Sequence, residues 1–261
     1  MRLEGADAME QMTGPDGYRV FGHDPRTHRW AQAALRAALK VASSPARQGP
    51  DNLRHQKTWF VGVDALPNAA DGSIAGVPLG GPWQEHVSAL PLHPAQLSII
   101  YKGYPKQDAQ ESDGNHRYRR DRAAAHVDGL LPEGPARQRF AREFHAYILA
   151  LPLNDVAASP TVVWPGSQRI MQAALATAYA GRDPAQIDIT DVYQAARRDV
   201  FAQGAPVPLR LVPGEAALLH PFVLHGTQAW GAGEDPSGQG RIIAFFRPEC
   251  AGGAREWLAT L

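Results

Sequence analysis

The stretch Val212-Pro-Gly-Glu-Ala-Ala-Leu-Leu-His-Pro-Phe-Val-Leu-His-Gly-Thr-Gln228 gives the strongest indication of how this chain folds. Pro213-Gly214 predicts a turn, and the apolar residues that follow predict a buried strand leading to His225. After a Gly-rich stretch, Arg241 opens a second apolar strand, 241–247. These two segments predict a β-rich fold and make the histidine and the arginine candidates for a binding site.

Other segments of the chain extend this prediction. The 25 Gly and 22 Pro residues divide the sequence into short pieces, which favours strands over a helix bundle. Further strands are expected at 57–63, 96–102, 124–128, 144–153, 161–164, 207–212 and 216–219. Helices are expected at 28–42 and within 168–203, whereas 67–83 and the polar stretch 103–122 are expected to be loops.

We therefore expect one domain over residues 1–261. Its first part, about 1–95, would supply helices, a strand and a loop that pack on the core. The core itself would span about 96–248 and contain the helical insertion 168–203. The fold class is mainly β with flanking helices.

The charge balance and the cysteine content limit the kinds of partner. Lys plus Arg and Asp plus Glu number 26 each, so no overall field favours nucleic acid or a membrane surface. The sequence has no signal-peptide pattern and no apolar run of about 18 residues that would cross a bilayer. The single cysteine, Cys250, excludes an internal disulfide. These features predict a cytoplasmic protein.

The segment Ala125-His126-Val127-Asp128 contains a His-x-Asp pattern. On a strand, residues two apart project to the same side, so His126 and Asp128 are expected to face one metal ion. A third ligand from a distant strand would complete a two-histidine, one-carboxylate triad, which leaves positions open as Fe(II) oxygenases require. His225 is the preferred third ligand. His220 is the alternative, and on a regular strand it would face the opposite side.

The order of these motifs resembles the phytanoyl-CoA dioxygenase family of Fe(II)- and 2-oxoglutarate-dependent oxygenases. His126-x-Asp128 resembles the first two iron ligands, and Val163-Trp-Pro-Gly-Ser-Gln168 resembles a turn midway through the core. Pro213-Gly-Glu215 resembles a later turn, and His225-Gly-Thr227 with Arg241 resembles the third ligand and the 2-oxoglutarate-binding positions. The resemblance covers about residues 97–248 and implies a double-stranded β-helix, that is, a cupin-like jelly-roll core.

The resemblance also implies roles for single residues. Iron would bind His126, Asp128 and His225. The distal carboxylate of 2-oxoglutarate would bind Arg241 and Thr227. The implied reaction uses O₂, hydroxylates a small molecule and releases succinate and CO₂. The carboxylate at Asp128 favours hydroxylation, because related halogenases carry a small residue at this position.

Three assignments have alternatives. Arg241 lies 16 positions after His225 (241 − 225), a long spacing that leaves Arg247 as a rival for the carboxylate. Lys102 is either a strand-end residue in solvent or a further contact to 2-oxoglutarate, and the basic residues 117–122 form either a solvated loop or a lid for an anionic substrate. The whole chain is alternatively a cupin-like metal-dependent enzyme other than an oxygenase, or an inactive jelly-roll protein that binds a small molecule or a partner.

Overall fold

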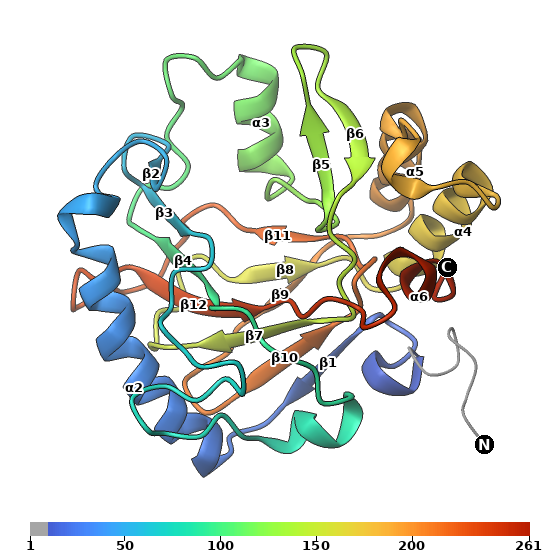
Figure 1. Ribbon diagram of the computed structural model, residues 1–261. Helices are drawn as coiled ribbons and strands as arrows, with labels where there is room; N and C mark the ends of the chain where they lie inside the picture. Colours follow the sequence, from blue (N-terminus) through green and yellow to red (C-terminus); the bar gives the residue numbers. More distant parts are fainter. Residues whose placement is uncertain (1–9) are drawn as a thin grey trace.

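Two main β-sheets, a two-stranded hairpin and several helices make up the computed structural model, which describes residues 10–261 (Figure 1). The larger sheet has the strand order β1-β10-β7-β12-β4-β3-β2, and all neighbouring strands are antiparallel. Its strands are β1 (Tyr18–Phe21), β2 (Leu53–Arg54), β3 (Trp59–Gly62), β4 (Gln96–Ile100), β7 (Ile148–Pro152), β10 (Ala216–Leu219) and β12 (Arg241–Phe246).

The smaller sheet faces the middle of the larger one. It has the order β11-β8-β9, with β8 (Thr161–Val163), β9 (Val207–Leu209) and β11 (His225–Thr227). An isolated bridge pairs His126 with His225, so the segment around His126 continues this sheet beyond β11. From β4 onward the chain therefore alternates between the sheets: β4, the His126 segment, β7, β8 and β9, β10, β11 and finally β12.

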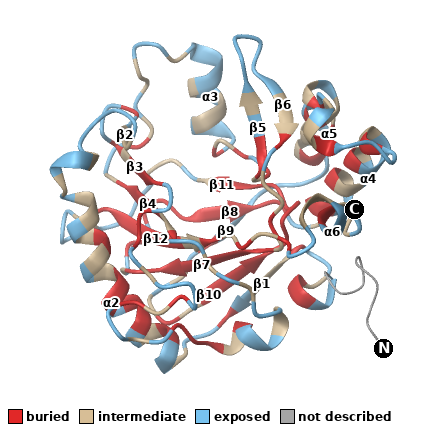
Figure 2. Cartoon of the chain, in the orientation of Figure 1, coloured by how far each residue is buried: buried red, intermediate tan, exposed pale blue. Residues whose placement is uncertain are grey.

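The residues of β12 show how the core is divided between two faces. Side chains alternate along a strand, so Ile242 and Ala244 lie on one face, in the cluster that includes Trp30 of α2 (Pro25–Ala42). Ile243 lies on the other face, in a cluster with Val163 between the two sheets. Figure 2 shows that the central strands of both sheets are buried, among them β7, β10, β12 and β8.

Helix α2 covers the outer face of the larger sheet for reasons that are visible in its sequence. Asp24 caps its N-terminus by accepting a hydrogen bond from the Arg26 N–H at 2.7 Å, and Pro25 occupies the first turn, where no backbone donor is needed. Its buried residues are Thr27, Trp30, Ala31, Ala33, Ala34 and Ala38. The small alanines let the helix approach the sheet closely.

A second helical layer covers the outer face of the smaller sheet. It contains α4 (Ser167–Tyr179), α5 (Thr190–Gln203) and α6 (Gly253–Leu258), which pack with Val162, Trp164 and Phe222 in one apolar cluster. Helix α3 (Asp113–Asp121) and the hairpin of β5 (Leu130–Glu133) and β6 (Gln138–Ala141) project together at the top of Figure 1. Short helical turns η1 (Pro45–Arg47), η2 (Pro82–His86) and η3 (Pro184–Gln186) complete the elements.

Several predicted elements are confirmed, among them β3, β4, β8, β10, β12, α2 and the helices α4 and α5 within 168–203. Others are wrong. The segment 124–128 is not a strand, since only His126 forms a bridge. The polar stretch 103–122 contains α3, whose N-cap Ser112 accepts a hydrogen bond from the Asn115 N–H at 3.3 Å. The hairpin β5–β6 and strand β1 were not predicted.

Within residues 10–261, none of the helices has the length and apolar character needed to cross a membrane.

Candidate active site

His126 and His225 lie directly opposite each other, although 99 residues separate them (225 − 126). The His126 N–H donates to the His225 carbonyl at 2.8 Å, and the His225 N–H donates to the His126 carbonyl at 3.1 Å. Gly226 makes this close approach possible, because a Cβ there would lie 2.2 Å from the Ala123 carbonyl oxygen. The His-Gly pair in the sequence therefore has a steric reason.

Each imidazole is oriented by its own backbone. Nδ1 of His126 lies 3.0 Å from the Ala124 carbonyl oxygen, and Nδ1 of His225 lies 3.0 Å from the Val223 carbonyl oxygen. A carbonyl can only accept, so each Nδ1 carries the hydrogen and each Nε2 points toward the space between the rings. Histidine ligands of metals are commonly fixed by such a bond from their second nitrogen.

Asp128 completes the cluster. Its Oδ1 lies 3.1 Å from Nε2 of His126 and its Oδ2 lies 3.8 Å from Nε2 of His225. One ligand atom from each of the three residues lies within 4.8 Å of the others, and this is the one such group found among residues 10–261. A proton on Nε2 of His126 and a metal ion are alternative ways to link this nitrogen to Oδ1.

The protonation states suit metal binding. Burial acts to raise the pKa of Asp128, but the hydrogen bond from His126 and the positive charge of Arg247 oppose burial, and this pKa lies well below its usual range. Burial lowers the pKa of His225 to about 4. At neutral pH the site therefore offers a carboxylate and a neutral imidazole, the forms that bind metals.

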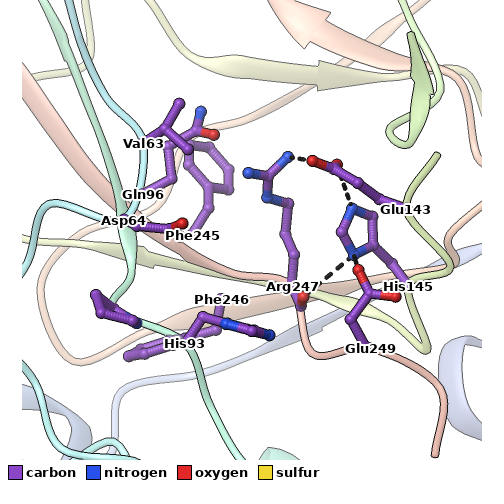
Figure 3. Close-up of a pocket in the computed structure, with 11 residues that line it drawn as sticks. Val63, Asp64, His93, Gln96, Glu143, His145, Phe245, Phe246, Arg247 and Glu249 are labelled. Carbon is purple, nitrogen blue, oxygen red and sulfur yellow. Dashed lines mark hydrogen bonds and ion pairs between the residues drawn. The ribbon is translucent and has the colours of Figure 1, made fainter.

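Arg247 lies beside the cluster, at the end of β12. Its Nη1 is 3.5 Å from Oδ2 of Asp128 and 3.9 Å from Oε2 of Glu143. Figure 3 shows its guanidinium directed toward Glu143. Arg247 therefore has two carboxylate neighbours.

Arg241, the first residue of β12, has no carboxylate neighbour among the described residues. Its side chain is buried, and Nε, Nη1 and Nη2 all lack a hydrogen-bond partner among the described residues. Burial lowers its pKa to about 10, which still leaves it charged at neutral pH. Strand alternation places it on the inner face with Ile243, between the sheets. A buried charge without a partner is costly, so this guanidinium requires an anion.

Thr227 is two residues beyond His225 on β11 and pairs in register with Thr161 of β8. The hydroxyl oxygen of Thr161 is also buried without a hydrogen-bond partner among residues 10–261. Arg241 lines a small cavity that reaches Pro160, the residue just before Thr161. The interior thus contains unsatisfied donors in addition to the His126, Asp128 and His225 cluster.

No protein-family profile matches the chain. A search of curated proteins found no match either. Solved structures do match. One is the non-heme alpha ketoglutarate dependent carbocyclase SnoK from nogalamycin biosynthesis, with 15% sequence identity, a TM-score of 0.52 and coverage of 96% of this chain and 87% of SnoK.

The chain shares its overall fold with SnoK. Two further matches have lower TM-scores. EctD from S. alaskensis, solved with 2-oxoglutarate and 5-hydroxyectoine, has 17% identity, a TM-score of 0.48 and coverage of 92% of this chain and 74% of EctD. The nickel complex of the non-heme monooxygenase ThoJ has 17% identity, a TM-score of 0.45 and coverage of 93% and 77%. At these identities the likeness concerns the fold alone.

Lys102 is not brought to this site. The strand β4 ends at Ile100, and Lys102 lies exposed on the following turn. It borders a surface groove with Tyr101 and Trp230. The structure therefore places Lys102 in solvent, as in the first of its two interpretations.

His220 is excluded from the cluster, but for a different reason from the one predicted. The chain turns between β10 and β11, so His220 and His225 do not share a regular strand and the alternation argument was wrong. His220 is buried, and its Nδ1 accepts a hydrogen bond from the Phe222 N–H at 3.1 Å. It is a satisfied core residue.

The basic stretch 117–122 lies mostly on α3, where part of its charge is compensated locally. Arg119 pairs with Glu111 at 3.2 Å, and Arg120 pairs with Asp121 at 2.7 Å.

The sequence did not reveal the surroundings of Arg247. His145 is buried, and its Nε2 lies 3.0 Å from Oε2 of Glu143. A Glu-x-His pattern was present at 143–145 and could have indicated this pair.

Proposed function

We propose that this chain is an Fe(II)- and 2-oxoglutarate-dependent dioxygenase that hydroxylates a small molecule. In this proposal His126, Asp128 and His225 hold iron, while Arg241 and Thr227 bind the distal carboxylate of 2-oxoglutarate. The observation that carries the proposal is the buried Arg241 guanidinium, whose three nitrogens have no partner among the described residues. The three metal-binding residues alone would fit many kinds of enzyme.

The order of the strands supports a double-stranded β-helix. The chain passes repeatedly from the larger sheet to the smaller one and back, which brings the His126 segment beside β11 at one edge. This is the arrangement of a jelly roll, in which two sheets are built from strands that alternate along the chain. The likeness of the fold to SnoK supports the same assignment.

The donor set fits iron. Two imidazole nitrogens and one carboxylate are the ligands of non-haem Fe(II) oxygenases, and they leave positions open for a cosubstrate and O₂. Bound iron, with 2-oxoglutarate and O₂, supplies the oxidising chemistry and yields succinate and CO₂. The protein's task is to orient these partners and exclude water.

Arg241 would contribute orientation. Its planar guanidinium can bind a carboxylate through two parallel hydrogen bonds, and this interaction is strong where water is excluded. The Thr227 hydroxyl can add one further donor. A cupin-like enzyme that acts only through its metal has no use for a buried, uncompensated arginine between the sheets. This difference favours the oxygenase over that alternative.

The test is anaerobic addition of Fe(II) and then 2-oxoglutarate to the purified chain. We expect a weak visible charge-transfer band that requires both, and slow succinate release in air. Asp128→Ala should abolish the band, and Lys102→Ala, which alters an exposed residue, should leave it unchanged. If the folded wild-type protein gives no band and no succinate, the proposal is wrong.

A further inference from the structure

We propose that Arg247 is a positioning residue. Its guanidinium contacts Oδ2 of Asp128, and this contact would leave Oδ1 as the single atom through which Asp128 binds iron. This inference rests on the proposed function. It concerns how many positions on the metal remain open, and it separates the role of Arg247 from that of Arg241.

The contacts of Asp128 divide between its two oxygens. Oδ1 is the closer to a histidine, at 3.1 Å from Nε2 of His126. Oδ2 is the oxygen beside Arg247, at 3.5 Å from Nη1, and its distance to Nε2 of His225 is longer, at 3.8 Å. Both side chains are mostly buried, with exposed fractions of 12% for Asp128 and 17% for Arg247, so solvent competes only weakly for this pair.

Arg247 has further contacts, with Glu143 and His145. Glu143 lies 3.9 Å from Nη1 of Arg247, and its Oε2 is bonded to Nε2 of His145 at 3.0 Å. Nδ1 of His145 lies 3.1 Å from the Arg247 carbonyl oxygen. Glu249 lies 3.6 Å from the same Nδ1 and accepts a hydrogen bond from the Phe144 N–H at 2.9 Å.

Figure 3 shows these side chains around a cavity of about 100 Å³ that Gln96 and Phe245 also line. His145 contacts the backbone carbonyl of Arg247 and Glu143 lies beside its guanidinium, and both contacts favour the orientation in which this guanidinium lies near Asp128. Groups that contact a metal-binding side chain usually serve to hold that side chain in its orientation.

The consequence concerns the open positions on iron. Three single-atom protein ligands leave three positions, two for the chelating 2-oxo acid and one for O₂. A carboxylate that bound through both oxygens would take one of these positions. By keeping a cation 3.5 Å from Oδ2, Arg247 would disfavour that second bond.

Arg247 is a poor anchor for the cosubstrate for the same reason. Its charge is already balanced by Asp128 and Glu143, whereas Arg241 has no acidic partner. The two arginines can therefore be distinguished by a ligand that lacks the distal carboxylate.

The experiment measures anaerobic binding of 2-oxoglutarate and of 2-oxobutyrate, which has no distal carboxylate, to the Fe(II) form through the charge-transfer band. Arg247→Gln should lower the affinity for both 2-oxo acids by the same factor, about tenfold, and should not lower the affinity for Fe(II). Arg247→Lys retains a cation and should restore most of the affinity. Arg241→Met is the matched control and should lower the affinity for 2-oxoglutarate but not for 2-oxobutyrate.

Other outcomes overturn the inference. If Arg247→Gln weakens 2-oxoglutarate but not 2-oxobutyrate, Arg247 is the anchor and the assignment is wrong. Unchanged binding of both, or a parallel loss of Fe(II) affinity, equally contradicts it. If the wild-type protein binds neither 2-oxo acid, the proposed function fails first and this inference fails with it, whereas the other outcomes leave the proposed function intact.

Discussion

Two arginines flank the apolar part of β12: Arg241 is its first residue, and Arg247, six positions later (247 − 241), directly follows its last. Arg247 has carboxylates on two sides, at 3.5 and 3.9 Å. Arg241 is more deeply buried and none of its nitrogens has a hydrogen-bond partner among residues 10–261. The residue type is the same, so the difference lies in burial and in charge compensation.

This comparison separates an internal role from a binding role. A compensated guanidinium stabilises the protein that surrounds it, because removing it leaves carboxylates unpaired. An uncompensated one destabilises the protein until an anion arrives. Substitutions at the two positions should therefore change stability in opposite directions, and each of the following predictions tests part of that contrast.

The largest effect is expected for Arg241→Met. Loss of the guanidinium should reduce affinity for 2-oxoglutarate about 100-fold, equivalent to about 2.7 kcal/mol. The free energy of unfolding of the metal-free protein should rise by about 1 kcal/mol, because a buried unpaired charge is replaced by an apolar side chain of similar length. Ligand titration and urea denaturation measure the two quantities. A fall in both would show that Arg241 has a structural partner and would remove the contrast.

Arg247→Met should have the opposite effect on stability. It leaves Asp128 buried beside Glu143 without the cation between them, and we expect the free energy of unfolding to fall by about 2 kcal/mol. Urea denaturation of the metal-free chain at neutral pH is the measurement. The double variant Arg247→Met with Glu143→Gln should recover part of the loss, and the absence of any recovery would argue against Glu143 as a partner.

His220 is a buried basic residue that, unlike the two arginines, can lose its charge. Burial lowers its pKa to about 3, whereas in the unfolded chain it is near 6.5. Between these values the unfolded state binds more protons, so stability falls as pH falls below 6.5. At pH 5.5 the loss from this residue is about 1.4 kcal/mol, one pH unit below the unfolded value.

His220→Asn keeps an acceptor for the Phe222 N–H and should remove this acid sensitivity. Urea denaturation at pH 7.5 and pH 5.5 compares the variant with the wild-type chain. If both lose stability equally over this interval, another group is responsible.

The smallest effect is expected for Lys102→Ala, which provides the baseline for the others. Lys102 is exposed on a turn, so its removal should change the free energy of unfolding by less than about 0.5 kcal/mol. Binding of 2-oxoglutarate should stay within about twofold. A larger loss would mean that Lys102 moves to the site when ligand binds.

Much of this architecture could be predicted from local patterns. The strand at 216–219 and the helix within 28–42 carry clear apolar and capping signals, and His126 with Asp128 and His225 stood out by residue type and motif order. What brings these three together was not local. His126 lies outside any regular strand, and its position depends on bonds to His225 and on the space that Gly226 leaves open.

The surroundings of the two arginines could not be predicted, because compensation depends on residues that are distant in sequence. Arg247 meets Asp128 and Glu143, which lie more than 100 positions earlier, and the sequence favoured Arg241 over Arg247 only through its family resemblance. The alternation argument that placed His220 failed because the chain turns after β10. In each case the tertiary structure, rather than the local sequence, decides the result.

The paired backbone bonds between His126 and His225 also bear on folding kinetics. They close a loop of 99 residues (225 − 126), and such long-range closures form late because their entropic cost must be met before the contacts that follow can form. The three candidate ligands therefore meet only once this loop has closed. Metal binding during refolding would report that closure, and tryptophan fluorescence would report separately when Trp30 becomes buried against Phe246 of the larger sheet.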